Sequence, residues 1–141
     1  SPQFVGGLIN STYMDYADSV YISGKYAYVA GFLSDSLAII DISNPSSPQL
    51  VGGLINSTYM DSARSVYVSG KYAYVAGPWS DSLAIIDISN PSSPQLVGGL
   101  IDSNMNAFSV YVSDKYAYVT GFGSDSLAII DISNPSSPQL V

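Results

Sequence analysis

The sequence predicts an all-β chain built from three repeated units. Most of its 141 residues belong to near-identical copies of one pattern, and no segment shows the 3.6-residue period of an amphipathic helix. Short segments rich in Val, Ile and Tyr alternate with clusters of Gly, Pro, Asn and Ser, which is typical of strands joined by tight turns. The sequence therefore predicts short strands throughout.

The repeat sets the domain organisation. We divide the chain into units 1–46, 47–92 and 93–136, and residues 137–141 start a fourth copy. The third unit is two residues shorter than the others. The first two units differ at six positions: Phe4/Leu50, Tyr16/Ser62, Asp18/Arg64, Ile22/Val68, Phe32/Pro78 and Leu33/Trp79.

The first half of each unit predicts a hairpin. In the first unit, residues 19–23 form a short strand and a turn at Gly24 leads into a second strand over residues 25–30. Gly24 and its counterpart Gly70 suit a positive φ, and Asp114 stands at this place in the third unit because Asp tolerates that conformation.

The second half of each unit predicts two more strands. Residues 36–43 are apolar on both faces, which indicates a strand buried on both sides. Two prolines then prevent the strand from continuing through residues 44–48. A fourth strand follows over residues 48–55, and its Gly52-Gly53 pair predicts a bulge.

Four strands in each unit of this length predict the blades of a β-propeller. Bulky Tyr26 and Tyr28 alternate with the small Ala27 along the second strand. We expect the tyrosines of one blade to fill the space that the alanine leaves on the next blade. These tyrosines are therefore interpreted as core residues.

At this point the chain resembles a known family. The segment LAIID recurs at 37–41, 83–87 and 127–131 and is followed each time by the segment ISNPSSP; KYAYVAG precedes it in the first two units. This pattern resembles the LVIVD repeat of bacterial and archaeal cell-surface proteins. The resemblance implies β-propeller blades and an extracellular or cell-surface location, and it implies no shared enzymatic activity.

Three blades do not close a ring, because propellers typically have about four to eight blades. A three-bladed arc exposes an apolar blade face at each end, and exposed apolar faces mark interaction surfaces. We therefore expect self-association, with a second copy completing six blades. Continuation of the ring by further repeats of a longer chain is the alternative. Residues 1–9 are predicted to be the fourth strand of a preceding blade.

The composition excludes several kinds of chemistry. The chain has no Cys and no His, so disulfides, thiolate or imidazole metal sites and Cys or His catalysis are excluded. With four basic residues and a formal net charge of −7, nucleic acid is not expected as a partner. No apolar run approaches the roughly 20 residues of a membrane-spanning helix.

The differences between units concentrate in two loops, 10–19 and 31–35, which strand order places on one rim. Loops on a rigid scaffold often carry binding residues, although drift in unconstrained loops explains the same differences. Aromatic and acidic side chains there indicate a lectin-like rim for a glycan or protein, with Trp79 as the leading anchor. The candidate rim residues are Tyr13, Asp15, Tyr16, Asp18, Phe32, Asp35, Tyr59, Asp61, Trp79, Asp81, Phe108 and Asp125.

One further acid ends the third strand of each unit; these acids are Asp41, Asp87 and Asp131. We interpret them as caps that accept N–H groups of the following turn. A pair of Asp residues can hydrolyse glycosides, but recurrence in every unit disfavours a single catalytic centre. We therefore expect a non-catalytic structural or adhesive module without a cofactor, with a glycoside hydrolase as the less favoured alternative.

Two further motifs suggest calcium binding and glycosylation. Asp102, Asn104 and Asn106 match the first half of a calcium-binding loop, but Ala107 and Ser113 stand where Gly and Glu are required. Calcium is therefore a weak candidate ligand. Asn10 and Asn56 begin Asn-Ser-Thr sequons and are candidate glycosylation sites.

Overall fold

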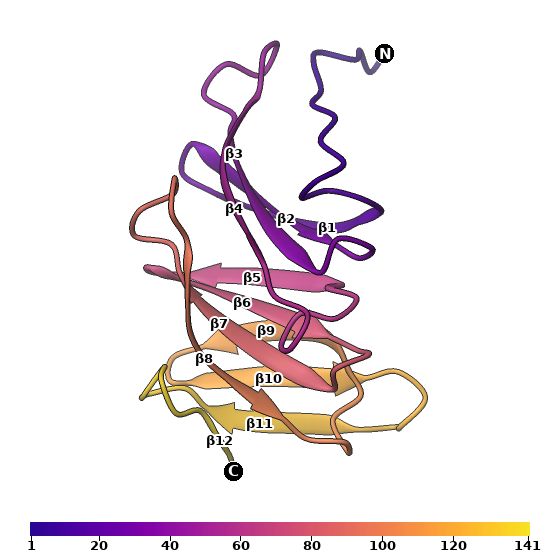
Figure 1. Cartoon of the computed structure of the whole chain (residues 1–141), viewed down its shortest axis with the longest axis vertical. Helices are drawn as coiled ribbons and strands as arrows, with labels where there is room; N and C mark the ends of the chain where they lie inside the picture. Colours follow the sequence, from indigo (N-terminus) through magenta and orange to yellow (C-terminus); the bar gives the residue numbers. More distant parts are fainter.

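The computed structural model describes residues 1–141 and confirms an all-β chain of three four-stranded antiparallel sheets (Figure 1). Blade 1 consists of β1 (Ala17–Ser23), β2 (Tyr26–Gly31), β3 (Ser36–Asp41) and β4 (Gln49–Ile55). Blade 2 consists of β5 (Ser65–Ser69), β6 (Tyr72–Gly77), β7 (Ser82–Asp87) and β8 (Gln95–Ile101). Blade 3 consists of β9 (Ala107–Ser113), β10 (Tyr116–Gly121), β11 (Leu127–Asp131) and β12 (Gln139–Leu140). The structure contains no helix that is able to span a lipid bilayer.

The turn chemistry follows the sequence. Gly24 and Gly70 have φ values of 59° and 58°, and Asp114 takes the same conformation with φ 52°. The bulge predicted in the fourth strand is also present, because Ile39 pairs with Gly52 while the next residue, Ile40, pairs with Leu50. One residue of β4 is thus left without a partner, which twists the outer strand locally.

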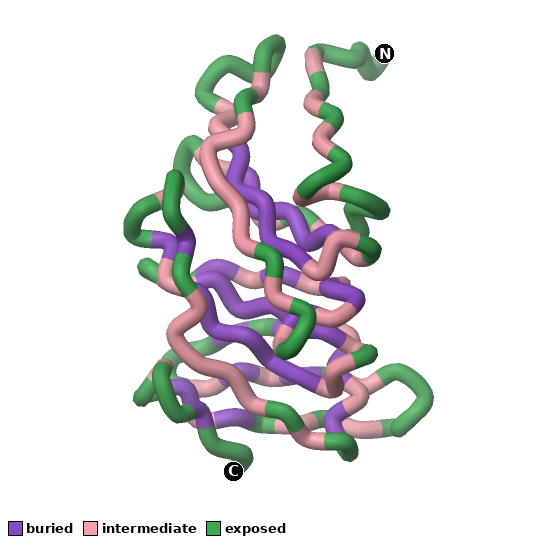
Figure 2. Tube along the Cα trace, viewed as in Figure 1, coloured by how far each residue is buried: buried purple, intermediate pink, exposed green.

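The blades pack face to face, as the alternation of Tyr and Ala predicts. Tyr28 of blade 1 and Ala73 of blade 2 lie in one buried cluster, and Tyr74 and Ala117 lie in the equivalent cluster between blades 2 and 3. β3 and β7 are buried along almost their whole length. Figure 2 shows this buried band running through the middle of the arc. The hydrophobic core therefore lies between blades.

The first strand of each blade lies on the inner side of the arc, next to the first strand of its neighbour. The rings of Tyr21 and Tyr67 have centroids 4.7 Å apart, and those of Tyr67 and Tyr111 are 4.6 Å apart. Ser65 Oγ accepts a hydrogen bond of 3.2 Å from the backbone N–H of Val110. Each inner strand is thus tied to the next one.

Both ends of the arc expose residues that are buried elsewhere. Val20 of blade 1 is 60 % exposed, whereas its counterpart Val66 is 5 % exposed. Leu127 of blade 3 is 60 % exposed, whereas its counterpart Leu37 is fully buried. We call these surfaces the N-terminal face of blade 1 and the C-terminal face of blade 3.

Residues 1–9 form no strand, which differs from the sequence prediction. Figure 1 shows them as a separate segment beyond blade 1, because the chain supplies no third strand beside them. Their position still resembles that of an outer strand. An ideal Cβ on Gly6 would lie 2.3 Å from the carbonyl oxygen of Pro45, and one on Gly52 would lie 2.3 Å from that of Pro91.

Candidate binding site at the rim

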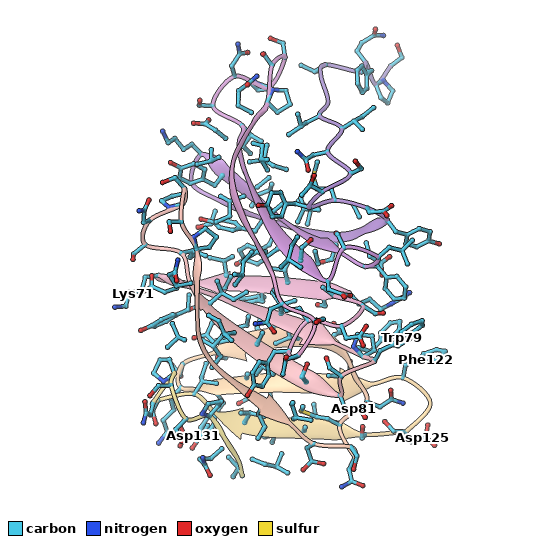
Figure 3. The ribbon with its side chains drawn as sticks, viewed as in Figure 1. Lys71, Trp79, Asp81, Phe122, Asp125 and Asp131 are labelled. Atoms are coloured by element: carbon cyan, nitrogen blue, oxygen red, sulfur yellow. The ribbon has the colours of Figure 1, made fainter.

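The two variable loops lie side by side on one rim of the arc. Phe32 N donates a hydrogen bond of 3.1 Å to Tyr16 O, and Leu33 N donates one of 3.1 Å to Asp15 O. Figure 3 shows Trp79, Asp81, Phe122 and Asp125 on one side of the blades and Lys71 and Asp131 on the other. The two variable loops therefore lie on one rim of the arc, as strand order predicts.

The centre of this rim breaks the repeat. Asp18, Arg64 and Phe108 occupy the same position in the three blades, directly before a serine of the inner strand. Arg64 Nε lies 3.3 Å from Asp18 Oδ2, and the Arg64 guanidinium carbon lies 4.2 Å from the centroid of Phe108. One guanidinium thus joins three blades, through an ion pair on one side and a cation–π contact on the other.

Aromatic rings surround Arg64. Phe32 and Trp79 pack edge to face with centroids 5.9 Å apart, and Phe108 and Phe122 stack at 5.0 Å. Trp79 and Phe122 remain 72 % and 69 % exposed. Between the two pairs lies a hollow of about 290 Å³ that we call the rim hollow; its lining residues are Phe32, Arg64, Pro78, Trp79, Asn106, Phe108 and Phe122.

The rim hollow combines apolar faces with polar groups. Arg64 and Asn106 are the polar residues of its lining, and Asp18, which does not line the hollow, offsets the charge of Arg64 through their ion pair. Exposed aromatic faces accept the apolar side of a sugar ring or an apolar side chain of a protein. The arrangement suits binding through stacking and hydrogen bonds.

Several predicted rim residues lie outside the rim hollow. The rings of Tyr13 and Tyr59 lie over Gly53 and Gly99, where a Cβ would come within 2.5 Å of either ring. Other predicted residues, Asp15, Asp61, Asp81 and Asp125, belong to loops of the rim but do not line the hollow.

The hollow also includes residues that sequence reasoning did not select, above all Arg64 and Phe122. Both were visible in the alignment of the units, because Arg64 replaces Asp18 and Phe122 stands where Phe32 stands. Pro78 occupies that same place in the second unit. The signal was variation between the units at two repeat positions, Asp18/Arg64/Phe108 and Phe32/Pro78/Phe122.

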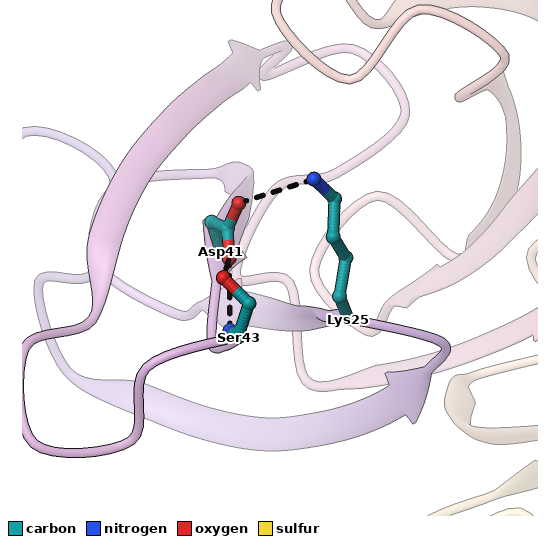
Figure 4. Close-up of polar contacts among 3 residues, drawn as sticks. All are labelled: Lys25, Asp41 and Ser43. Atoms are coloured by element: carbon teal, nitrogen blue, oxygen red, sulfur yellow. Dashed lines mark hydrogen bonds and ion pairs between the residues drawn. The ribbon is translucent and has the colours of Figure 1, made fainter.

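The acids that end the third strands lie on the opposite side. Asp41 Oδ1 accepts hydrogen bonds from Ser43 N at 2.8 Å and Ser43 Oγ at 2.6 Å, and Lys25 Nζ lies 3.5 Å from Asp41 Oδ2 (Figure 4). Asp87 and Asp131 make the same bonds to the serine two residues later. The serine hydroxyl and amide hold the pKa of each of these carboxyls below its ordinary value.

The residues of the calcium hypothesis point to different partners. Asp102 Oδ1 accepts bonds of 2.9 Å and 3.1 Å from the backbone and side-chain nitrogens of Asn104. Asn106 Nδ2 donates to the carbonyl oxygen of Phe122 instead. No group of three or more Asp carboxylates is arranged to hold a metal ion. Calcium binding stays a prediction.

The sequon asparagines begin turns. The Oδ1 atoms of Asn10 and Asn56 accept hydrogen bonds of 3.0 Å from the backbone N–H groups of Tyr13 and Tyr59. These bonds use the amide oxygen, and the nitrogen that glycosylation modifies is not the bonded atom. Glycosylation of either residue stays a prediction.

The comparisons with solved structures agree on the fold. A protein from Lactobacillus plantarum superimposes with a TM-score of 0.75 at 17 % identity, over 89 % of this chain and 40 % of that one. A periplasmic gluconolactonase from Pseudomonas aeruginosa gives 0.72 at 16 % identity, over 92 % and 42 %. The β-propeller domain of Cps50 (Swd1) from Myceliophteria thermophila gives 0.69 at 13 % identity, over 89 % and 41 %. At such identities the likeness shows the fold alone.

The chain thus spans about two fifths of the length of these proteins. No curated protein sequence matches it. The model of the LVIVD repeat matches three times, at residues 15–54, 61–101 and 106–141, and these matches cover most of the chain. The chain therefore belongs to the LVIVD repeat family, and its three sheets are β-propeller blades.

Proposed function

We propose that the chain is a non-catalytic structural or adhesive module in which a second copy completes the ring to six blades. The observation that carries the proposal is the exposure of apolar side chains on the two end faces. Each exposes the surface that the internal joints bury, and large exposed apolar faces mark interaction sites. Closed symmetry with two identical joints is the simplest way to cover both faces.

The two end faces carry the repeat counterparts of the two surfaces that meet at each internal joint. The C-terminal face presents Tyr118, Leu127 and Ile129, the counterparts of residues that blade 1 buries against blade 2. The N-terminal face has an open apolar groove of about 400 Å³, lined among others by Val20 and Ala27, whose counterparts receive the neighbouring blade. Joining the two faces therefore repeats a joint that the chain already makes twice.

A cell-surface location and an adhesive role rest on the family resemblance and on the exposed aromatic rim. The absence of catalysis rests on the placement of the acids. Each blade has one of these acids, Asp41, Asp87 or Asp131, and its Oδ1 atom caps the turn that follows the third strand. The likeness to a gluconolactonase at 16 % identity concerns the fold and suggests no particular acid as a catalyst.

Charged substitutions at the faces test ring closure. We expect Val20→Asp and Leu127→Asp to convert a dimer into a monomer in sedimentation velocity, because each buries a carboxylate in an apolar joint. Thr58→Asp, on an exposed loop of blade 2, is the matched control and leaves the dimer intact. If the Val20 and Leu127 variants sediment like the parent, the end faces do not form the joint.

A second candidate function is recognition of a neutral sugar at the rim hollow. The observation that favours it is Arg64, which lines the hollow together with two aromatic pairs and forms an ion pair with Asp18. Adjacent hydroxyls of a sugar both donate and accept hydrogen bonds, which matches a guanidinium beside a carboxylate. The net charge of −7 disfavours an acidic ligand.

A further inference from the structure

Each blade places one tyrosine of its first strand on the inner side of the arc. These residues are Tyr21 on β1, Tyr67 on β5 and Tyr111 on β9. Successive side chains of a strand point to opposite faces, so Val66 and Val68 enter the joint between blades and Tyr67 points to the other side of the strand. None of the three tyrosines is buried, and we call this row the tyrosine ladder.

Neighbouring rings of the tyrosine ladder contact each other across the joints. Their centroids are 4.7 Å apart between Tyr21 and Tyr67 and 4.6 Å apart between Tyr67 and Tyr111, with interplanar angles of 56° and 54°. At these separations carbon atoms of the two rings are in van der Waals contact, at about 3.5–4 Å. The hydroxyl of Tyr67 also raises the pKa of Tyr111, through a hydrogen bond and through its charge. The hydroxyl ends of these two rings therefore lie next to each other.

Hydrogen bonds between the inner strands hold this ring pair in register. Ser65 Oγ accepts a bond of 3.2 Å from the backbone N–H of Val110, the residue before Tyr111. An equivalent bond of 3.4 Å joins β1 to β5. Two groups that are held in contact react much faster than two groups that meet by diffusion. The fold therefore keeps the phenol rings of Tyr67 and Tyr111 in a position to react with each other.

We propose that Tyr67 and Tyr111 form a site of oxidative cross-linking, at which a haem peroxidase with hydrogen peroxide joins two blades through a dityrosine bond. Each phenol gives up one electron and its hydroxyl proton, and the two radicals form a carbon–carbon bond between ring carbons next to the hydroxyl-bearing carbons. Those two carbons then release their hydrogens as protons while the oxygens are reprotonated, which restores both phenols. The chain loses two hydrogen atoms in total, and one hydrogen peroxide is reduced to two waters. The adjacent hydroxyls favour Tyr111 over Tyr21 as the partner of Tyr67.

The site belongs to an internal joint of the chain. Both tyrosines lie where blade 2 meets blade 3, so the cross-link does not depend on ring closure by a second copy. The chain has no Cys, so a disulfide cannot join these blades. Proteins at the cell surface, the location proposed above, meet an oxidising environment. A bond between the two rings closes residues 67–111 into a covalent loop and restricts the unfolded chain.

Other tyrosines are less suited to coupling within one chain. Tyr26 and Tyr28 have ring centroids 6.5 Å apart, and Tyr28 is only 4 % exposed. Tyr16 is 67 % exposed, but the ring beside it belongs to Phe32, which has no phenol hydroxyl to oxidise. Tyr16 is therefore a control position that is open to an oxidant and has no tyrosine ring in contact.

Oxidation of the purified chain with a peroxidase and hydrogen peroxide tests the site. We expect a product that migrates as one chain on a denaturing gel, shows dityrosine fluorescence and is lighter than the parent by two hydrogen atoms. Peptide mapping should place the bond between Tyr67 and Tyr111. Tyr67→Phe keeps the ring but removes its hydroxyl, so the yield of this product should fall at least about tenfold. Tyr16→Phe is the matched control and should keep the yield within about twofold of the parent.

Oxidation in urea separates the effect of the fold from the reactivity of tyrosine itself. The native chain should form the Tyr67–Tyr111 bond and the unfolded chain should not favour it. The linked chain should also unfold at a temperature about 5 °C or more above that of the parent, because its unfolded state is restricted. A bond mapped to other tyrosines, equal yields from the parent and Tyr67→Phe, or products between chains alone would overturn the proposal.

Discussion

Asp35 Oδ1, in blade 1, accepts a hydrogen bond of 2.9 Å from the backbone N–H of Ser62, in blade 2. The bond crosses the joint next to the rim, and it ties the loop before β3 to the loop before β5. Asp81 occupies the same position in blade 2, but the following loop is two residues shorter and no equivalent bond forms. The side chains of the two acids therefore differ in this one hydrogen bond.

This difference predicts unequal costs of substitution. Asp35→Ala is expected to lower the free energy of unfolding by about 1 kcal/mol more than Asp81→Ala, because it leaves a partly buried N–H without its acceptor. Asp35 and Asp81 have φ values of 50° and 49°, so backbone strain from alanine is matched. Urea unfolding of both variants measures the difference, and equal costs would show that the bond does not stabilise the joint.

The core tyrosines give a second prediction. Tyr28→Ala is expected to lower the free energy of unfolding by about 3 kcal/mol, since Tyr28 is buried against Ala73 and the change leaves a cavity. Tyr26→Ala removes a ring of the same size from the same strand, but Tyr26 is only half-buried beneath Lys25. A smaller loss for Tyr26→Ala is the expected control result in thermal unfolding. The interpretation of Tyr28 as a core residue fails if the two losses are equal.

The turn caps predict how stability depends on acid. Serine hydrogen bonds hold the pKa of Asp41, Asp87 and Asp131 below the ordinary value of about 3.9. The native state therefore binds fewer protons than the unfolded state in this range. The stabilisation is complete above that ordinary value and is lost as the pH falls through the lowered pKa values.

Substitution of one cap tests this. Asp87→Asn removes the carboxyl group, so stability should fall less steeply between about pH 5 and pH 2 than it does in the parent. Ser89→Ala keeps the carboxyl group but removes its strongest hydrogen bond. Its Asp87 pKa should move upward in an NMR titration. An unchanged Asp87 pKa in that variant would assign the shift to another group.

Sugar recognition predicts that substitutions in the rim hollow, and not beside it, weaken glycan binding. If a neutral glycan binds there, Trp79→Ala should weaken binding about 30-fold, as is typical of an interface hot spot. Leu33→Ala is the matched control, since Leu33 is exposed at the equivalent place in blade 1 and does not line the hollow. A glycan array and calorimetry measure both. Binding of a peptide but no glycan would assign the rim to protein recognition.

The blades were predictable because each residue choice recurs. Positive φ at Gly24 and Asp114, the bulge beside Gly52 and the contact of Tyr28 with the Ala73 region all follow from local rules of turn chemistry and side-chain size. Three copies of one pattern make such rules easy to recognise. Residues 1–9 differ, since a strand requires a partner and this chain places no β3 beside them.

The site was only partly predictable, because it depends on contacts between blades. Trp79, Phe32 and Phe108 were recognised as rim aromatics, but their grouping around Arg64 depends on contacts between residues of different blades. Tyr13 has the residue type of a binding side chain, yet it covers Gly53. Sequence alone does not tell a ring that binds a ligand from a ring that fills the space above a glycine.

Native mass spectrometry of the 141-residue chain tests the central claim most directly. Ring closure by a second copy predicts one dominant species of twice the 14.9 kDa chain mass in dilute solution, and its conversion to monomer by Val20→Asp. A parent chain that remains a 14.9 kDa monomer at micromolar concentration, with both end faces open to solvent, would contradict it.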